Sequence, residues 1–259
     1  MPLTILLHSS KTMVPVPPTR ELTTPVFEDV ANELTDYLQE LTVAELQKIM
    51  HISEKLATEV EDTYLTRLEA PVSATVETFR GDIYSGLRSL EWSDAEKDFA
   101  QKHLKILSGL YGVLKPYDGI QPYRLELGYR LPGEQYKNLY SFWSDRVAER
   151  LPIDGPIINV TSDEYSKVVL PFLDPSRIIT PAFLTQKAAG QEPVFVVVHA
   201  KIARGAYARW LIKRGLATVD GLEKFDDLGY VYSAERSTPS QPVYVCQQFG
   251  GIGLSQRLN

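Results

Sequence analysis

Cysteine, histidine and long apolar runs are scarce in this chain of 259 residues, and each scarcity excludes a class of protein. A single cysteine, Cys246, excludes an internal disulfide framework and suits a reducing compartment. The four histidines lie far apart in the sequence, without the spacing of metal ligands. No apolar run approaches the roughly 20 residues that span a bilayer, and the short run at residues 3–7 has no basic region before it, so it predicts a buried strand rather than a signal peptide. We therefore expect a cytoplasmic protein with no membrane contact, no metal and no resident cofactor.

An excess of positive charge is also missing. The formal net charge is −6, which argues against a generic coat protein for nucleic acid. The bases are unevenly spread, however, because residues 193–219 contain five bases and no acid, and residues 100–117 contain three lysines and no acid. Charges interact over roughly 8–10 Å at physiological salt, so an acidic chain can still present a basic cleft.

Apolar residues make up 44% of the chain and charged residues 23%, as in ordinary globular proteins. No repeat or long linker divides the sequence, so we predict one mixed α/β domain over residues 1–249, with a central sheet surrounded by helices, and a mobile tail over 250–259. The apolar spacing predicts helices over residues 27–38, 42–51, 53–68, 93–107, 138–151, 161–169 and 200–214. It predicts strands over residues 3–8, 121–126, 156–160 and 194–199, the last of them central, and a closing pair over 229–232 and 242–247.

The run from Leu107 to Pro116 holds two glycines, Gly109 and Gly112, after a helix that is rich in lysine. Two close glycines can turn backbone N–H groups outward, and such a turn can hold a phosphate. The pattern resembles the hairpin of helix-hairpin-helix DNA-binding modules. The alternative is structural, since the two glycines can simply end a helix and form a tight turn.

Polar residues follow several of the predicted strands and supply candidates for a catalytic role. The carboxyl ends of strands in α/β sheets open onto clefts, which favours Lys11 and Asn159. The candidate catalytic residues are Lys11, Tyr123, Arg124, Asn159, Asp163 and Lys201. Each also has a structural explanation, as a loop lysine, a surface ion pair, a helix cap or a member of a buried hydrogen-bonded network that specifies the fold.

Taken together, the motifs resemble the YaaA family of peroxide stress proteins over residues 3–248. The motifs are FRGDIYSGL at 79–87, LSGLYGVLKP at 107–116, QPYRLELG at 121–128, LYSFW at 139–143, INVTSDEY at 158–165 and AKIARG at 200–205. One departure is the first loop, which reads HSSKT at residues 8–12 where the family usually has Ser-Pro-Ala-Lys-Thr.

The resemblance implies a bacterial cytoplasmic protein of the oxidative stress response that is associated with DNA repair. It implies the single-domain cantaloupe fold, a helix-hairpin-helix element near residues 93–116 and a positively charged cleft that binds duplex or branched DNA. DNA and DNA-repair proteins are the partners to expect, and a link to lower intracellular free iron is known for the family without an evident iron site.

Two functions remain open from the sequence. The first is DNA binding through phosphates, and its candidate contacts are Lys102, Lys105, Gly109, Gly112, Lys115, Lys201, Arg204, Arg209 and Lys213. The second is an enzyme that acts on a nucleotide-like or nucleobase-like small molecule, because Asn, Asp and Tyr beside cations are typical of a small-ligand pocket. Convergence of Lys11, Arg124, Asn159, Asp163 and Lys201 would favour the second function, and one basic groove would favour the first.

Overall fold

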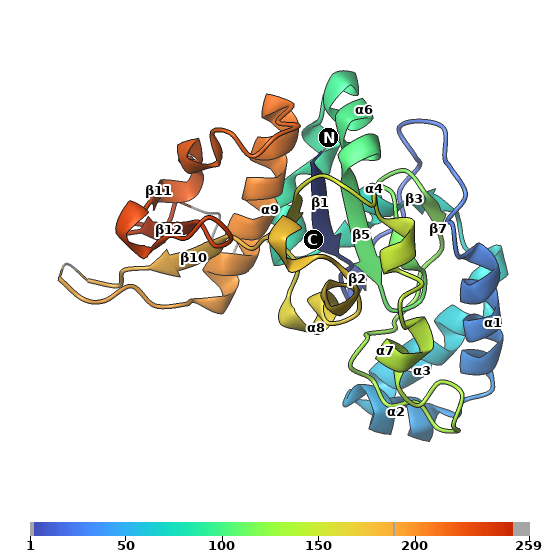
Figure 1. Ribbon diagram of the computed structural model, residues 1–259. Helices are drawn as coiled ribbons and strands as arrows, with labels where there is room; N and C mark the ends of the chain where they lie inside the picture. Colours follow the sequence, from blue (N-terminus) through green and yellow to red (C-terminus); the bar gives the residue numbers. More distant parts are fainter. Residues whose placement is uncertain (1–2, 189, 251–259) are drawn as a thin grey trace.

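The computed structural model describes residues 3–188 and 190–250, so all but the first residue of the predicted tail lies outside the described residues. The main sheet has five strands in the order β6-β5-β1-β8-β9 (Figure 1). Its strands are β1 (Thr4–His8), β5 (Leu104–Ser108), β6 (Gly112–Leu114), β8 (Ile157–Asn159) and β9 (Ile178–Ile179). All neighbouring pairs are parallel except β5 with β6. The prediction of a mixed α/β fold with a central sheet is confirmed.

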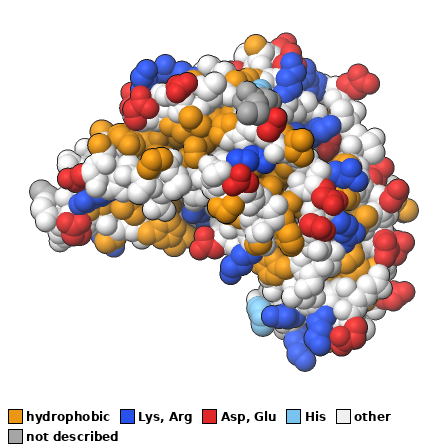
Figure 2. All heavy atoms as spheres, viewed as in Figure 1, with side chains coloured by type: hydrophobic (Ala, Val, Ile, Leu, Met, Phe, Trp, Pro, Cys, Tyr) orange, Lys and Arg blue, Asp and Glu red, His pale blue; other side chains and the backbone are white. Residues whose placement is uncertain are grey.

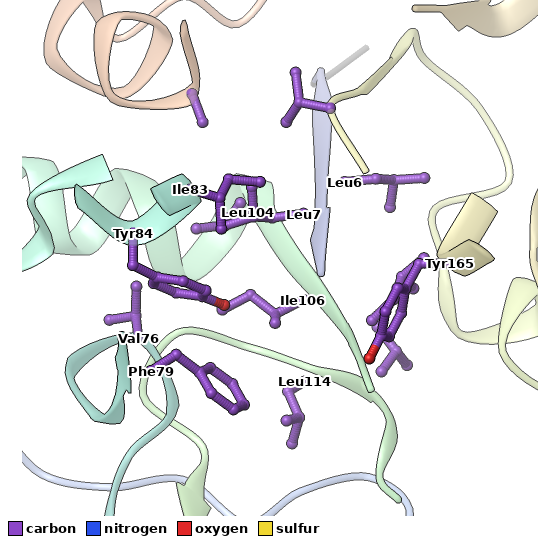
Figure 3. Close-up of a cluster of buried hydrophobic side chains, with 14 of the residues drawn as sticks. Leu6, Leu7, Val76, Phe79, Ile83, Tyr84, Leu104, Ile106, Leu114 and Tyr165 are labelled. Atoms are coloured by element: carbon purple, nitrogen blue, oxygen red, sulfur yellow. The ribbon is translucent and has the colours of Figure 1, made fainter. Parts of the chain in front are cut away.

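Strand β1 is the centre of this sheet, and all five of its residues are buried. Its sequence TILLH is apolar on both faces, as expected for a strand that is covered on both sides. Leu6 pairs with Lys105 of β5 and Asn159 of β8, which fixes the register on both sides. Figure 3 shows Leu7 on the side of Ile83 and Leu6 on the opposite side.

The helices of the first half of the chain are α1 (Glu28–Gln39), α2 (Val43–Met50), α3 (Glu54–Leu65), α4 (Thr75–Thr78), α5 (Asp82–Leu87) and α6 (Asp94–His103). Capping boxes begin two of these helices, Thr42 with Glu45 at the start of α2 and Ser93 with Glu96 at the start of α6. Short pairs of strands, β2 (Thr12–Met13) with β4 (Phe79–Arg80) and β3 (Ser73–Ala74) with β7 (Gly119–Ile120), fasten the loops between them. The second half adds α7 (Leu139–Trp143), α8 (Asp163–Ser166) and α9 (Val197–Arg214).

Helix α9 crosses α5 at a distance that only glycine allows. A Cβ on Gly205 of α9 would lie 1.8 Å from the carbonyl oxygen of Ile83. A Cβ on Gly86 of α5 would lie 2.0 Å from the carbonyl oxygen of Ile202. Because backbone meets backbone here, the position of α9 against the rest of the molecule is tightly determined.

A second sheet lies on the other side of α9 and extends away from the main sheet (Figure 1). Its strands are β10 (Ala182–Thr185), β12 (Val243–Cys246) and β11 (Tyr230–Tyr232), in that order. The predicted closing pair is confirmed, since β11 and β12 are antiparallel. Phe183, Tyr207, Phe225 and Tyr244 form an aromatic cluster between this sheet and α9.

The prediction of a central strand over residues 194–199 is wrong. Only Val194 pairs, in an isolated bridge with Thr185, and α9 begins at Val197. Phe195 is 56% exposed, so this run is not the buried interior of a sheet. A short run of β-branched residues does not distinguish a strand from the first turn of a helix that tertiary packing holds in place.

The helix-hairpin-helix element expected near residues 93–116 is also absent. Helix α6 ends at His103, and the chain continues as β5, the turn at residues 109–111 and β6. Ile106 pairs with Leu114, so the two glycines lie in a β-hairpin. The apolar residues of 104–114 face the core on both sides of the strands, and that burial outweighs the local resemblance to the motif.

Five further predicted elements differ, four helices in extent and one strand by its absence. Residues 104–107 leave the predicted fourth helix for β5, and residues 66–68 leave the third helix for a short 3-10 turn. The predicted helices over 138–151 and 161–169 contract to α7 and α8 followed by turns, and residues 121–126 form no strand. Among the described residues, no helix combines the length and apolarity needed to cross a membrane.

Candidate functional site

The carboxyl ends of β1, β5 and β8 meet at one edge of the main sheet. The chain leaves β1 toward β5 on one side, and leaves β8 toward β9 on the other, so β1 and β8 form a topological switch point. Ligands of open α/β sheets bind at such points, outside the strand ends. We name the residues gathered here the carboxyl-edge site, which consists of His8, Ser9, Lys11, Glu126, Asn159, Tyr165, Lys201 and Arg204.

His8, the last residue of β1, is held on several sides. Its ring stacks on Tyr165 with a centroid distance of 4.9 Å, and its Nδ1 accepts a hydrogen bond of 3.3 Å from the Ser162 N–H. The Tyr84 hydroxyl donates to the His8 carbonyl oxygen at 2.9 Å. Figure 3 shows Tyr84 and Tyr165 approaching β1 from opposite sides. An accepting Nδ1 places the proton of the neutral ring on Nε2.

The imidazole of His8 is neutral at physiological pH. Burial, and then the positive charges of Arg204 and Lys201, lower the pKa of His8 to about 3. Both causes act against the charged form of the ring. The site therefore offers an imidazole that donates from Nε2 and carries no charge of its own.

A buried network of hydroxyl groups lies beneath His8. The Ser9 hydroxyl donates to the Tyr165 phenol oxygen at 3.0 Å, and the hydroxyl groups of Ser108 and Tyr123 are 2.7 Å apart. Burial raises the pKa of both tyrosines, so they stay neutral. These groups satisfy one another, which gives Tyr123 the structural role that the sequence left open for it.

Glu126 is buried beside Tyr165, with 8% of its surface exposed. Its Oε2 lies 4.0 Å from the Nζ of Lys11, which is half exposed. Burial, together with the nearby charge of Glu164, raises the pKa of Glu126, whereas Lys11 acts to lower it. Glu126 therefore has a lysine at 4.0 Å and a second carboxylate within electrostatic reach, an arrangement that suits the acceptance of a proton or of a hydrogen bond.

A shallow hollow of about 70 Å³ is lined by residues 127–130, 137, 138 and 140, two of which bond Glu164. The Gly128 N–H donates to Glu164 Oε1 at 2.9 Å, and the Tyr140 hydroxyl donates to the Glu164 carbonyl oxygen at 3.1 Å. Both residues line the hollow, together with Tyr129, Arg130, Lys137 and Asn138. The hollow therefore lies next to residues that hold Glu164, although neither Glu126 nor Glu164 lines it.

Lys201 and Arg204 come from the first half of α9 and stand three residues apart, on neighbouring positions of one face. Arg204 is partly buried, and burial lowers its pKa while only Asp163 acts in the opposite direction. Neither cation forms an ion pair within the part of the chain that the structure describes. Arg209, one turn further on, is by contrast paired with Asp227.

The other predicted catalytic residues lie close by but have different tasks. Asn159 is fully engaged, since its Oδ1 accepts from the Thr161 hydroxyl at 2.7 Å and its Nδ2 donates to Thr180 at 3.2 Å. Asp163 is exposed at the start of α8 and faces the charge of Arg204. Arg124 lies within electrostatic reach of Glu126, and its buried Nε has no hydrogen-bond partner among the described residues.

The two glycines that were expected to bind phosphate are buried. The N–H groups of Leu110 and Tyr111 both donate to the Ser108 hydroxyl, at 3.2 and 3.0 Å. The Trp143 indole donates to the Gly109 carbonyl oxygen at 2.9 Å, and a Cβ on Gly112 would lie 2.8 Å from the same ring. The amides of this turn are therefore used inside the protein and do not face an anion in solution.

The remaining predicted cations lie elsewhere. His103 bonds the Leu3 carbonyl oxygen at 2.7 Å, and the Leu3 N–H donates to Ala217 at 3.1 Å, so α6 and α9 both end near the start of β1. We name Lys102, Lys213 and Arg214 the amino-edge cations. Five residues of strand separate this end from His8, a span of about 17 Å. Lys105 and Lys115 form a further pair, in which burial and then Lys115 lower the pKa of Lys105.

The amino-edge cations have a structural explanation. They occupy the last turns of α6 and α9, where positive charge complements the negative end of the helix dipole. On the face shown in Figure 2, cations stand in small groups between acids and do not form one continuous patch. The predicted DNA contacts therefore divide into separate groups.

His8, Glu126 and Tyr165 were absent from the candidates predicted from the sequence. His8 directly precedes the Ser-Ser-Lys loop at the end of a strand, and that position was the signal available for it. The Ser9–Tyr165 bond joins residues 156 positions apart, a proximity that no local pattern shows. No group of three or more His, Cys, Asp or Glu side chains suited to a metal is found within residues 3–188 and 190–250.

Comparison with known proteins assigns the chain to a family. The family model described as peroxide stress protein YaaA matches residues 3–236. A UPF0246 protein of Salinispora tropica is 46% identical over 256 residues, which cover 98% of this chain and 97% of the relative. UPF0246 proteins of Roseobacter denitrificans and Ruegeria pomeroyi are 40% and 39% identical, each over 86% of this chain and 90% of the relative. The chain therefore belongs to the YaaA family of peroxide stress proteins.

Proposed function

We propose that this peroxide stress protein binds DNA through the phosphate backbone, with Lys201 and Arg204 at the centre of the contact. The observation that carries the proposal is the state of these two cations, which are neighbours on α9 and form no ion pair among the described residues. Unpaired cations on a rigid helix can neutralise phosphates and release the counterions of DNA. The five bases of residues 193–219, with no acid among them, add to the same local field.

The contact is expected to involve the backbone and not the bases. A helix that reads sequence enters the major groove, which is about 12 Å wide. Helix α9 is packed against α5 on one side and against the second sheet on another, and ten of its residues are buried. It therefore presents side chains to phosphates without entering a groove, which suits duplex and branched DNA alike.

Lys102 and Lys213 are exposed but stand at the amino edge, and Lys115 stands with Lys105 in a further group, whereas Arg209 is already held by Asp227, so the contact centres on Lys201 and Arg204. Gly109 and Gly112 have no part in it, because their turn is buried. Protection against peroxide would then come from shielding damaged or recombining DNA, or from bringing repair proteins to it. Binding that favours a branched over a linear duplex of the same length would support the recruitment of repair proteins.

The test is a salt titration of binding to a labelled duplex, followed by fluorescence anisotropy. The logarithm of the affinity should fall against the logarithm of the salt concentration with a slope of about −0.9 per neutralised phosphate. The double variant Lys201→Ala and Arg204→Ala should reduce that slope by about two. The matched control is Lys48→Ala with Lys55→Ala on the exposed faces of α2 and α3. An unchanged slope in the first variant, or an equal loss in the control, would refute this assignment.

A further inference from the structure

We infer that the carboxyl-edge site binds a small phosphate monoester, with its phosphate on Lys201 and Arg204 and a hydrogen-bond donor of the same ligand on Glu126. A nucleoside monophosphate carries both groups, in its phosphate and in the N–H or O–H groups of its base and sugar. The inference does not depend on DNA binding, because it adds to the two cations of α9 the buried His8, Glu126 and Tyr165 at the end of β1, which a duplex backbone would not require.

The site lies at the strand ends where ligands of open α/β sheets bind. His8 and Asn159 end the two strands that form the topological switch point, and Ser162 links them through its hydrogen bond to His8. Strand ends at such a point are covered by loops whose side chains can close on a ligand. Here the loop after β1 supplies Lys11, and α9 supplies Lys201 and Arg204.

The positive charge of Arg204 has no contacting carboxylate among the described residues. Arg204 is partly removed from water, yet no carboxylate is in contact with it among the described residues, and the exposed Asp163 acts on it only through space. Partial burial of a cation without a partner is unfavourable. A dianionic phosphate would supply the missing charge, and Arg and Lys are the side chains that most often bind one.

A hydrogen-bond acceptor, the carboxylate of Glu126, lies beside Tyr165 in the same site. The Tyr165 ring contacts His8 on its face, and its hydroxyl end lies beside Glu126, so one aromatic side chain joins the two halves of the site. The carboxylate of Glu126 accepts hydrogen bonds, and the ammonium group of Lys11 favours the charged form of Glu126. A phosphate ester with a donor group matches both halves, whereas inorganic phosphate matches only the first.

A purely structural role explains some residues of the site but not all of them. Ser9, Ser108, Tyr123 and Asn159 satisfy one another or their neighbours, so fold specification accounts for them. The same explanation leaves Lys201 and Arg204 without a function, because neither cation forms an ion pair among the described residues. The partly buried Arg204 without a partner, with the exposed Lys201 beside it, is therefore the feature that a structural role does not explain.

The experiment follows the imidazole of His8 by NMR in protein labelled at histidine, with inorganic phosphate and adenosine monophosphate as probes. The free protein should keep His8 neutral down to about pH 5, because its ring is buried beside two cations. A bound phosphate stabilises the imidazolium, so saturation with either probe should raise the pKa of His8 by about one unit or more. A His8 signal that neither probe moves at millimolar concentration would overturn the inference.

Variants separate the two halves of the site. Arg204→Gln should weaken both probes by about tenfold or more, the loss of one charge-assisted hydrogen bond. The matched control Lys213→Gln, at the other end of α9, should leave both affinities unchanged. Glu126→Gln should weaken adenosine monophosphate but not inorganic phosphate. Equal effects of Arg204→Gln and Lys213→Gln would show a general charge effect and no site.

The result is distinguishable from that of the DNA test. A protein that keeps its salt slope on DNA but shows no response of His8 to the two probes would refute the small-ligand site alone. A protein that binds the probes but not DNA would refute the proposed function alone. Addition of a short duplex serves as the third arm, because displacement of adenosine monophosphate by the duplex would show that the two ligands share Lys201 and Arg204.

Discussion

Gly205→Ala should destabilise the protein, although alanine is the better helix former. Alanine gains about 1 kcal/mol over glycine in a helix interior. Its Cβ would lie 1.8 Å from the Ile83 carbonyl oxygen and 2.8 Å from the Leu87 nitrogen, whereas ordinary contacts begin near 3.4 Å. Helix α5 must therefore retreat by about 1.5 Å, which opens a packed interface along its length.

Overpacking of a core costs about 1–3 kcal/mol when side chains can adjust, and more is expected here because the obstacle is backbone. After the gain in helix propensity, we expect a net loss of at least about 2 kcal/mol, which lowers Tm by roughly 4–8 °C in a chain of this size. The assay is thermal and urea unfolding followed by circular dichroism. Arg204 adjoins Gly205, so the phosphate response of His8 should weaken in the same variant.

Gly215→Ala at the end of α9 is the matched control. No atom lies within 4 Å of a Cβ there, and the cost comes only from the left-handed φ of +58°. That cost should be about 1 kcal/mol. A Gly205→Ala variant as stable as the wild type, or more stable, would show that helix propensity outweighs the contact and that α5 and α9 do not cross this closely.

Two further predictions concern charge. A base whose pKa is lowered by folding binds more protons when unfolded, so the free energy of unfolding should fall as the pH drops from about 6.5 toward 3, by up to about 1.4 kcal/mol per pH unit. His8→Gln should remove this contribution, and urea titrations at pH 7 and pH 5 should then differ less than in the wild type; an unchanged difference would mean that His8 is not buried in its neutral form. Arg204→Gln should leave stability unchanged or raise it without ligand, whereas Lys213→Gln should cost about 0.3–1 kcal/mol through the lost dipole interaction. A larger loss for Arg204→Gln than for Lys213→Gln in the same unfolding series would favour a structural role for Arg204.

The sequence predicted elements whose cause is local. Strand β1 is a short apolar run, and α2 and α6 begin at capping boxes that are present with both bonds, as at Ser93 and Glu96. The closing strand pair consists of short runs of β-branched and aromatic residues and was predicted almost to its ends. These features depend on residues within a few positions of one another.

The elements that were predicted wrongly depend on distant packing. Helix α9 has buried residues around most of its circumference, because α5 and the second sheet cover it from different sides, so its apolar residues show no single stripe. Its β-branched first turn then has the pattern of a strand. The glycine pair in LSGLYGVL fits a helical hairpin locally, and only the pairing of β6 with β5 determines that it is a β-turn.

The candidate site was predicted only in part, because some of its residues are marked by their local position and others meet only in the fold. The rule that polar residues at strand ends form a site found Lys11 and Asn159, and the acid-free helix found Lys201 and Arg204. Glu126 and Tyr165 became visible only when residues far apart in sequence met at the end of β1. Burial then decides their chemistry, since it raises the pKa of Glu126 and lowers that of His8.

The cations at the two ends of α9 differ in what their positions cost the folded protein. Lys213 and Arg214 stand where the helix dipole is negative, so folding alone favours them. Lys201 and Arg204 stand in the half of the helix nearer its positive end, beside a histidine whose protonation they oppose. A charge arrangement that lowers stability persists in proteins mainly where function needs it. The unfavourable placement of Lys201 and Arg204, rather than the number of bases in the chain, is therefore the strongest argument that an anion belongs at this edge of the sheet.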